Sequence, residues 1–155
     1  MMSDTASNYP IQDKSIRDDL DEIIVLNQEL RDWIVALKHP KGSISHMCEN
    51  NLALFHSRLE ELTSSSLTVI QLDEAVCEME ALFRQESARI DSVWKGRNPH
   101  AKAKKQGMIY EIKVLATSIR EILGKMKRDL DVKKQRMSIL FVLNVVCLLF
   151  LFVLS

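Results

Sequence analysis

The sequence predicts an all-α protein, namely an up-down helical bundle or coiled coil followed by a single C-terminal transmembrane helix. Glycine and proline are scarce, at 4 and 3 of 155 residues, and aromatic residues make up only 6%, whereas β-sandwiches and barrels need many turns. Apolar residues recur at alternating spacings of three and four, which indicates helices with one buried face. All charged residues lie before Ser138. The chain therefore divides into a charged, helix-forming part and an uncharged C-terminal part.

The first predicted helix runs from about Ser15 to Lys38 and is ended by the His39-Pro40-Lys41-Gly42 turn. Its apolar seam contains one polar residue, Asn27, which can set the register between helices. Residues 1–14 contain Pro10 and few apolar side chains, so we expect a flexible tail there. The seam consists of Ile16, Leu20, Ile23, Asn27, Leu30, Ile34 and Leu37.

The second and third predicted helices repeat the same spacing. The second runs from about Ser45 to Leu62, with a seam of Cys48, Leu52, Phe55, Leu59 and Leu62. The third follows a capping-box pattern formed by Thr68 and Gln71. Glu86 interrupts its seam, and the sequence from Lys95 to Pro99 ends it. That seam consists of Val69, Leu72, Val76, Met79, Phe83, Ile90 and Val93.

The fourth predicted helix begins near Gln106 and completes the bundle. Its seam is Met108, Ile112, Leu115, Ile119, Ile122 and Met126. No proline follows Met108, so one rod of about 70 Å can continue into the C-terminal segment. Short loops favour antiparallel neighbours, and we expect residues 15–137 to form a cytosolic helical bundle with a basic juxtamembrane stalk. The sequence leaves open whether this helix joins the bundle or stands free.

Residues 138–155 are predicted to form a transmembrane tail anchor. Between Ile139 and Leu154, 15 of 16 residues are apolar, and Asn144 is the exception. At the α-helical rise this stretch covers about 24 Å, which is short but sufficient with its flanks. The first 30 residues show no signal-peptide pattern, so the expected topology is a single-pass tail anchor.

Basic residues before the apolar segment predict the orientation. By the positive-inside rule they place the N-terminal part in the cytosol, and they can contact anionic headgroups. The strongly apolar span and its uncharged end favour the endoplasmic reticulum or outer nuclear membrane over the mitochondrial outer membrane. The predicted membrane-surface residues are Lys125, Lys127, Arg128, Lys133, Lys134 and Arg136.

The net charge of zero conceals two oppositely charged parts. Residues 1–94 hold 8 basic and 17 acidic side chains, and residues 95–137 hold 13 and 4. One interpretation is that the acidic helices pack beside the basic fourth helix while the basic segment faces the lipid. The other is an acidic outer surface that remains available to a basic partner.

No motif predicts an enzyme, a cofactor or a metal site. The phosphate-binding, dinucleotide-binding and zinc-ligand spacings are missing. His46, Cys48 and His56 do not share one helix face, and Cys48 and Cys77 are expected in the core. The basic run from Lys95 to Lys105 has no aromatic stacking residues, so we expect no nucleic-acid partner. No small-molecule substrate is expected.

The run from Leu26 to Ile34, LNQELRDWI, resembles the first helix of a spectrin repeat, in which a tryptophan follows heptad leucines. The resemblance covers Ser15 to Trp94. It implies a three-helix coiled unit used for spacing and protein binding, as in nesprin-like proteins, which also carry a C-terminal membrane span.

Together these observations predict a non-enzymatic, tail-anchored membrane adaptor or tether whose cytosolic helices bind a coiled-coil partner or form a homo-oligomer at a lipid bilayer. The alternative is a SNARE-like or tethering component of vesicle trafficking, because a bundle, a stalk and an anchor also look like a SNARE. The seam residues expected to carry the helix contacts are Leu20, Asn27, Leu30, Leu115, Ile119 and Ile122.

Overall fold

The computed structural model describes residues 14–37, 42–93 and 103–155, and these residues form helices and no strand. The helices are α2 (Lys14–Leu37), α3 (Gly42–Ser64), α4 (Val69–Val93) and α5 (Ala103–Leu154). The predicted all-α bundle is confirmed, with each helix within a few residues of its expected limits. The predicted flexible tail lies outside the described residues, except that its last residue, Lys14, opens α2.

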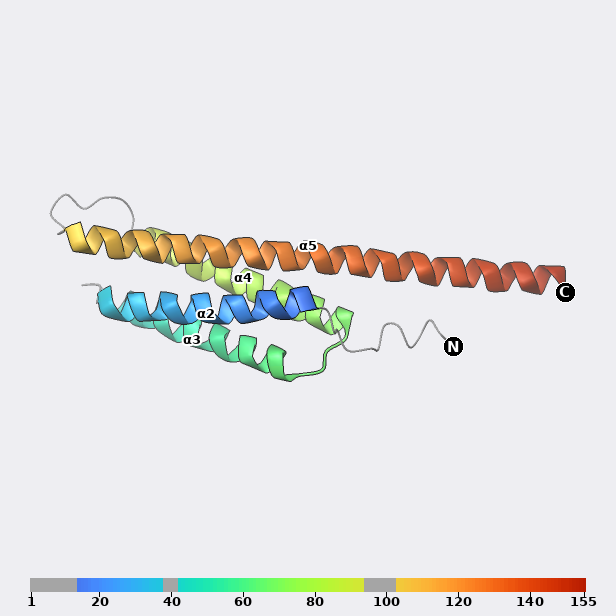
Figure 1. Cartoon of the computed structure of the whole chain (residues 1–155), viewed down its shortest axis with the longest axis horizontal. Coiled ribbons are helices and arrows are strands. Elements are labelled where there is room, and N and C mark those ends of the chain that lie inside the picture. The colour runs from blue at the N-terminus through green and yellow to red at the C-terminus, as the bar shows by residue number, and fades with distance from the viewer. Residues whose placement is uncertain (1–13, 38–41, 94–102) are drawn as a thin grey trace.

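The helices form a closed ring in which each contacts two neighbours, in the order α2, α3, α4, α5 and back to α2. Contacts between α4 and α5 show that neighbours are antiparallel, because Glu80 meets Lys127 and Asp73 meets Lys134. α3 and α4 are antiparallel as well, because Asn51 meets Glu86 and Arg58 meets Glu78. Figure 1 shows the result, in which α5 extends far beyond the other helices. The up-down topology follows from short connections between helices that each have one apolar face.

The core lies along the bundle axis and is built from the predicted seams. Phe55 of α3 and Phe83 of α4 are fully buried, and their ring centroids lie 5.1 Å apart. Asn27 is also fully buried, and its Nδ2 donates a hydrogen bond to the carbonyl oxygen of Leu52 at 3.1 Å. This bond ties α2 to α3 at one level, because a buried amide is costly to leave unpaired.

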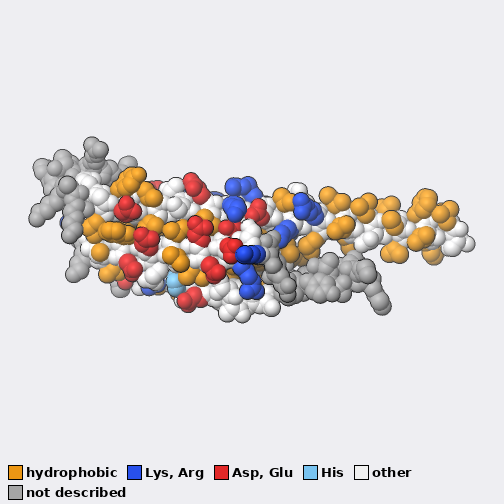
Figure 2. Space-filling view, in the orientation of Figure 1, with side chains coloured by type: hydrophobic (Ala, Val, Ile, Leu, Met, Phe, Trp, Pro, Cys, Tyr) orange, Lys and Arg blue, Asp and Glu red, His pale blue; other side chains and the backbone are white. Residues whose placement is uncertain are grey.

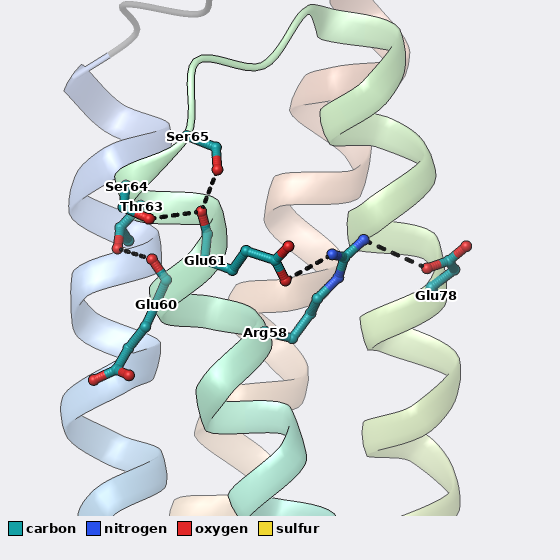
Figure 3. A network of polar contacts seen from close by, with 7 residues as sticks. All are labelled: Arg58, Glu60, Glu61, Thr63, Ser64, Ser65 and Glu78. Atoms are coloured by element: carbon teal, nitrogen blue, oxygen red, sulfur yellow. Dashed lines mark hydrogen bonds and ion pairs between the residues drawn. The ribbon is translucent and has the colours of Figure 1, made fainter.

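The connection between α3 and α4 is held by local polar contacts. The hydroxyls of Thr63, Ser64 and Ser65 donate to carbonyl oxygens of the last turn of α3, and Arg58 bridges Glu61 at 2.9 Å and Glu78 of α4 at 3.9 Å (Figure 3). The predicted capping box at the start of α4 is confirmed. The backbone N–H of Thr68 donates to Gln71 Oε1 at 3.1 Å, and that of Gln71 donates to Thr68 Oγ1 at 3.2 Å.

One uninterrupted helix, α5, serves both the bundle and the apolar C-terminal segment. It has 52 residues, which corresponds to about 78 Å. Its core-facing side chains are buried as far as Leu130. The fourth helix therefore belongs to the bundle, and only residues 131–137 separate the last buried position from the apolar segment. The stretch from Lys125 to Leu130, which contains three of the predicted membrane-surface residues, packs against α2 and α4.

Candidate membrane anchor and the surface around it

The last part of α5 is an apolar helix that contacts no other element. Every residue from Ser138 to Ser155 is exposed, and Phe152 and Val153 are each 80% exposed. By length and composition, α5 is the one described helix long and apolar enough to cross a membrane, and none of its most apolar window is buried. A soluble bundle helix would bury such a surface, because exposed apolar patches of this size normally mark an interaction or membrane site.

Three of the lysines preceding this segment are paired with acidic side chains of the bundle. Lys125 Nζ lies 3.3 Å from Asp19 Oδ1 of α2, and Lys134 Nζ lies 2.9 Å from Asp73 Oδ2 of α4. A longer contact, 4.0 Å, joins Lys127 Nζ to Glu80 Oε2. These contacts favour the interpretation in which the acidic helices pack beside the basic helix, because opposite charges meet across both of its interfaces.

The two aspartates of these pairs are largely buried. Asp19 and Asp73 are each only 6% exposed, and Asp19 Oδ2 and Asp73 Oδ1 have no hydrogen-bond partner among the described residues. Each carboxylate therefore depends on one lysine for its charge compensation. The hydrogen bond and the charge of Asp73 raise the pKa of Lys134 above its ordinary value, so this lysine keeps its positive charge at neutral pH.

The other three predicted membrane-surface residues lie on the exposed or half-buried part of α5. Arg128 and Arg136 are exposed, and Lys133 is half-buried. Lys134 and Arg136 precede Ser138 by four and two residues, or about 6 and 3 Å along the helix, whereas Lys125 is about 20 Å away. Only the basic residues from Lys133 onward lie within the thickness of a headgroup layer above the apolar segment.

The acidic partners of these lysines were not identified in the sequence. The signal is visible in their spacing, since Asp19 follows Ile16 by three residues and precedes Ile23 by four. Asp73 follows Val69 by four residues and precedes Val76 by three. A carboxylate at core-facing spacing needs a cation from a neighbouring helix, and that cation could have been sought on the basic fourth helix.

The outer face of α2 carries acidic residues that the bundle does not use. Asp18, Asp21, Glu22 and Glu29 are exposed, and no ion pair joins them to other residues that the structure describes. Val25, 65% exposed, lies among them. Figure 2 shows acidic side chains spread over the bundle and basic ones gathered near the point where the apolar helix leaves it. We call these four residues and Val25 the acidic α2 face.

A second polar cluster lies inside the bundle, between α3 and α4. Glu86 is fully buried, and its Oε1 accepts hydrogen bonds from Asn51 Nδ2 at 2.6 Å and Arg89 Nη1 at 3.1 Å. Burial, followed by the charge and hydrogen bond of Glu86, raises the pKa of the Cys48 thiol to about 12. The thiol is therefore protonated at neutral pH and is a poor nucleophile. The hydrogen bond from Asn51 to Glu86 joins α3 to α4.

The predicted seam residues lie at the helix contacts. Leu20, Asn27, Leu30, Leu115 and Ile119 are buried, and Ile122 is half-buried against the core. Trp33, the tryptophan of the spectrin-like run, also packs partly buried against the core. Within the described ranges, no group of three His, Cys, Asp or Glu residues could hold a metal ion. His46 lies outside the residues whose side chains are described.

The chain was compared with protein-family models, curated proteins and solved structures. No family model, no curated protein and no solved structure matches it. The predicted resemblance to a spectrin repeat therefore stays a prediction, and the function is inferred from the anchor, the acidic α2 face and the packing of the bundle.

Proposed function

We propose that this chain is a non-enzymatic membrane adaptor whose last helix crosses an endomembrane and whose bundle recruits a protein partner on the cytosolic side. The observation that carries the proposal is the division of α5, which is bundle core as far as Leu130 and fully exposed and apolar from Ile139 onward. A bilayer suits the apolar part of α5, because a helix makes all its backbone hydrogen bonds internally and these side chains match the lipid tails.

The charge pattern supports the cytosolic placement of the bundle. Lys133, Lys134 and Arg136 lie within two turns of the apolar segment, and positive charge near a span is retained on the cytosolic side. The same side chains can attract anionic lipid headgroups, at about 1 kcal/mol each. The proposed membranes are the endoplasmic reticulum and the outer nuclear membrane, which are continuous with one another.

The acidic α2 face supports recruitment of a basic helical partner. Its charges are unpaired within the described structure, and Val25 supplies an apolar contact at its centre. A helix with lysine or arginine around an apolar stripe would complement it in charge and shape. Such binding does not require the bundle to open, because the partner binds an outer face and the four seams remain buried.

Membrane insertion is tested with the full chain expressed in cells as an N-terminal fluorescent fusion. We expect it to resist alkaline carbonate extraction and to overlap with an endoplasmic reticulum marker. Replacing Leu143 and Leu148 by Arg places two charges near the centre of the segment, at a cost of about 2.5 to 3.5 kcal/mol each, and should release the protein into the soluble fraction. Replacing exposed Val35 and Leu54 of the bundle by Arg is the matched control and should leave it inserted.

Three outcomes would contradict the proposal. Extraction of the unmodified fusion by carbonate would exclude a spanning helix, and accumulation at mitochondria would exclude the proposed membrane. Retention of the Leu143→Arg, Leu148→Arg variant after carbonate treatment would mean that another part of the chain holds it. Recruitment is tested by proximity labelling, in which proteins labelled by the wild type and lost from an Asp18→Asn, Glu22→Gln, Glu29→Gln variant should be rich in basic helices.

A further inference from the structure

The apolar half of α5 has one face that differs from the rest. Residues at alternating spacings of three and four continue the core-facing seam of the bundle, in which Leu123, Met126 and Leu130 are fully buried. The continuation carries Asn144, the one polar side chain between Ile139 and Leu154, and one turn further on the free thiol of Cys147. The continued seam consists of Met137, Leu140, Asn144, Cys147, Leu151 and Leu154.

An asparagine at this position needs a hydrogen-bond partner. Asn144 is exposed on α5, and its amide has no partner among the described residues. Asn27, an asparagine on a seam inside the bundle, meets the same need by donating a hydrogen bond to a backbone carbonyl of the next helix. In a bilayer neither water nor lipid tails supply such a partner at the depth of Asn144, so a second helix must do so.

Resting on the proposed membrane insertion, we infer that Asn144 and its seam form a parallel contact with a second copy of this chain. A carboxamide is both donor and acceptor, so two copies of Asn144 can satisfy each other. A second copy carries its amide at the same depth and in the same orientation, which no other span is bound to do. In a parallel pair with heptad spacing, each seam residue faces its own copy, so Cys147 meets Cys147.

The contact is confined to the membrane. The seam position before Met137 is Lys133, and a lysine facing its own copy disfavours close approach. The seam also lies on the side of α5 toward which the bundle core packs. In the dimer α5 must therefore bend between Lys134, which is held to Asp73 of the bundle, and Leu140, so that the two bundles lie side by side. This arrangement leaves the acidic α2 face available and gives each dimer two copies of it.

Oxidative cross-linking of the full chain in phosphatidylcholine vesicles tests the inference. Cys48 and Cys77 are replaced by Ala, and copper-phenanthroline with oxygen serves as the oxidant that removes two electrons and two protons from a Cys147 pair. We expect a disulfide-linked dimer whose yield persists as the protein-to-lipid ratio is lowered. Asn144→Leu should weaken association about three- to thirtyfold. This variant should therefore reach the same dimer yield only at a protein-to-lipid ratio that is higher by that factor, whereas Asn144→Gln should retain most of the association.

A matched control moves the thiol off the seam. A Cys147→Ser, Leu149→Cys variant carries its thiol on the opposite side of the helix and should cross-link far less. Equal cross-linking at positions 147 and 149, or no effect of Asn144→Leu, would overturn the inference. Carbonate extraction of the same vesicles separates the two proposals, because an inserted but monomeric protein refutes only the dimer, and an extracted protein refutes the membrane anchor as well.

Discussion

At the scale of single residues, the buried carboxylates distinguish this bundle from a purely apolar one. Glu86, Asp19 and Asp73 each interrupt or flank an apolar seam, and each is compensated from a neighbouring helix or turn. Removing charges from water is costly, so such pairs contribute more to the specificity of helix pairing than to stability. In this bundle they join α2 to α5, α4 to α5 and α3 to α4, each at one height.

For the Glu86 cluster, we predict that replacing Arg89 lowers the free energy of unfolding, whereas replacing Glu86 leaves it nearly unchanged or raises it. Arg89→Ala leaves a fully buried carboxylate with only Asn51 as a donor, and it should lower the free energy of unfolding by about 1 to 4 kcal/mol. Glu86→Leu removes the buried charge and fills similar volume, so it should change that free energy by less than about 1 kcal/mol or raise it. Asn51 and Arg89 are partly exposed and can turn to water.

Urea denaturation of the full chain in detergent micelles, followed by circular dichroism, measures both variants. Arg84→Ala is the control, because Arg84 is exposed on the same helix and, among the residues that the structure describes, forms its ion pair with Glu80. A larger loss for Glu86→Leu than for Arg89→Ala would mean that the carboxylate itself stabilises the bundle.

At the scale of elements, α5 combines two environments in one helix. The heptad seam is continuous through both, but its surroundings change from contact with α2 and α4 to exposure on all sides from Ser138 onward. Because no proline interrupts the helix and its backbone bonds are internal, the change of environment does not end it. The boundary is marked only by side chains, namely the basic residues before Ser138.

Because α5 packs in the bundle, we predict that an aspartate costs more stability at a buried position of α5 than at an exposed one. Ile119→Asp puts a carboxyl group into a fully buried site and should lower stability by several kcal/mol, a large part of the roughly 5 to 15 kcal/mol of a typical domain. Val114→Asp changes an exposed position, at 39% exposure, and should cost less than about 1 kcal/mol. Thermal melts followed by circular dichroism and sedimentation compare them. Equal melts would show that α5 is a free stalk.

At the scale of the whole molecule, one continuous helix joins the bundle to the apolar segment. The pair between Lys134 and Asp73 holds the start of α4 to the last turns before the apolar segment, and Figure 1 shows the α3–α4 connection at the same end of the bundle. In the proposed adaptor, this contact would hold the outer faces of the bundle in one orientation relative to the membrane.

A proline in the short segment between core and anchor should remove this fixed orientation. Val132 is 47% exposed on α5, and Val132→Pro removes a helix hydrogen bond and kinks the chain there, at about 3 kcal/mol or more. A spin label on the bundle of vesicle-bound protein should then report faster motion, while resistance to carbonate stays unchanged. Val132→Ala is the control, and unchanged motion in the proline variant would place the rigidity elsewhere.

The helix limits, the seams and the capping box at Thr68 could all be predicted from the sequence, because each depends on spacing within about one or two helical turns. The apolar segment was equally visible, since its composition does not depend on its neighbours. Three contacts could not be predicted in this way. Asp19 with Lys125, Asp73 with Lys134, and Asn51 with Glu86 join residues 106, 61 and 35 positions apart.

The sequence by itself determined that this protein consists of four amphipathic helices with an apolar end, because local spacing and composition decide which residues can share a face. Only the tertiary structure decided that α5 closes the ring and that Lys125 and Lys134 turn toward the bundle. Which helices become neighbours depends on the fit of whole faces and on charges brought together from distant parts of the chain.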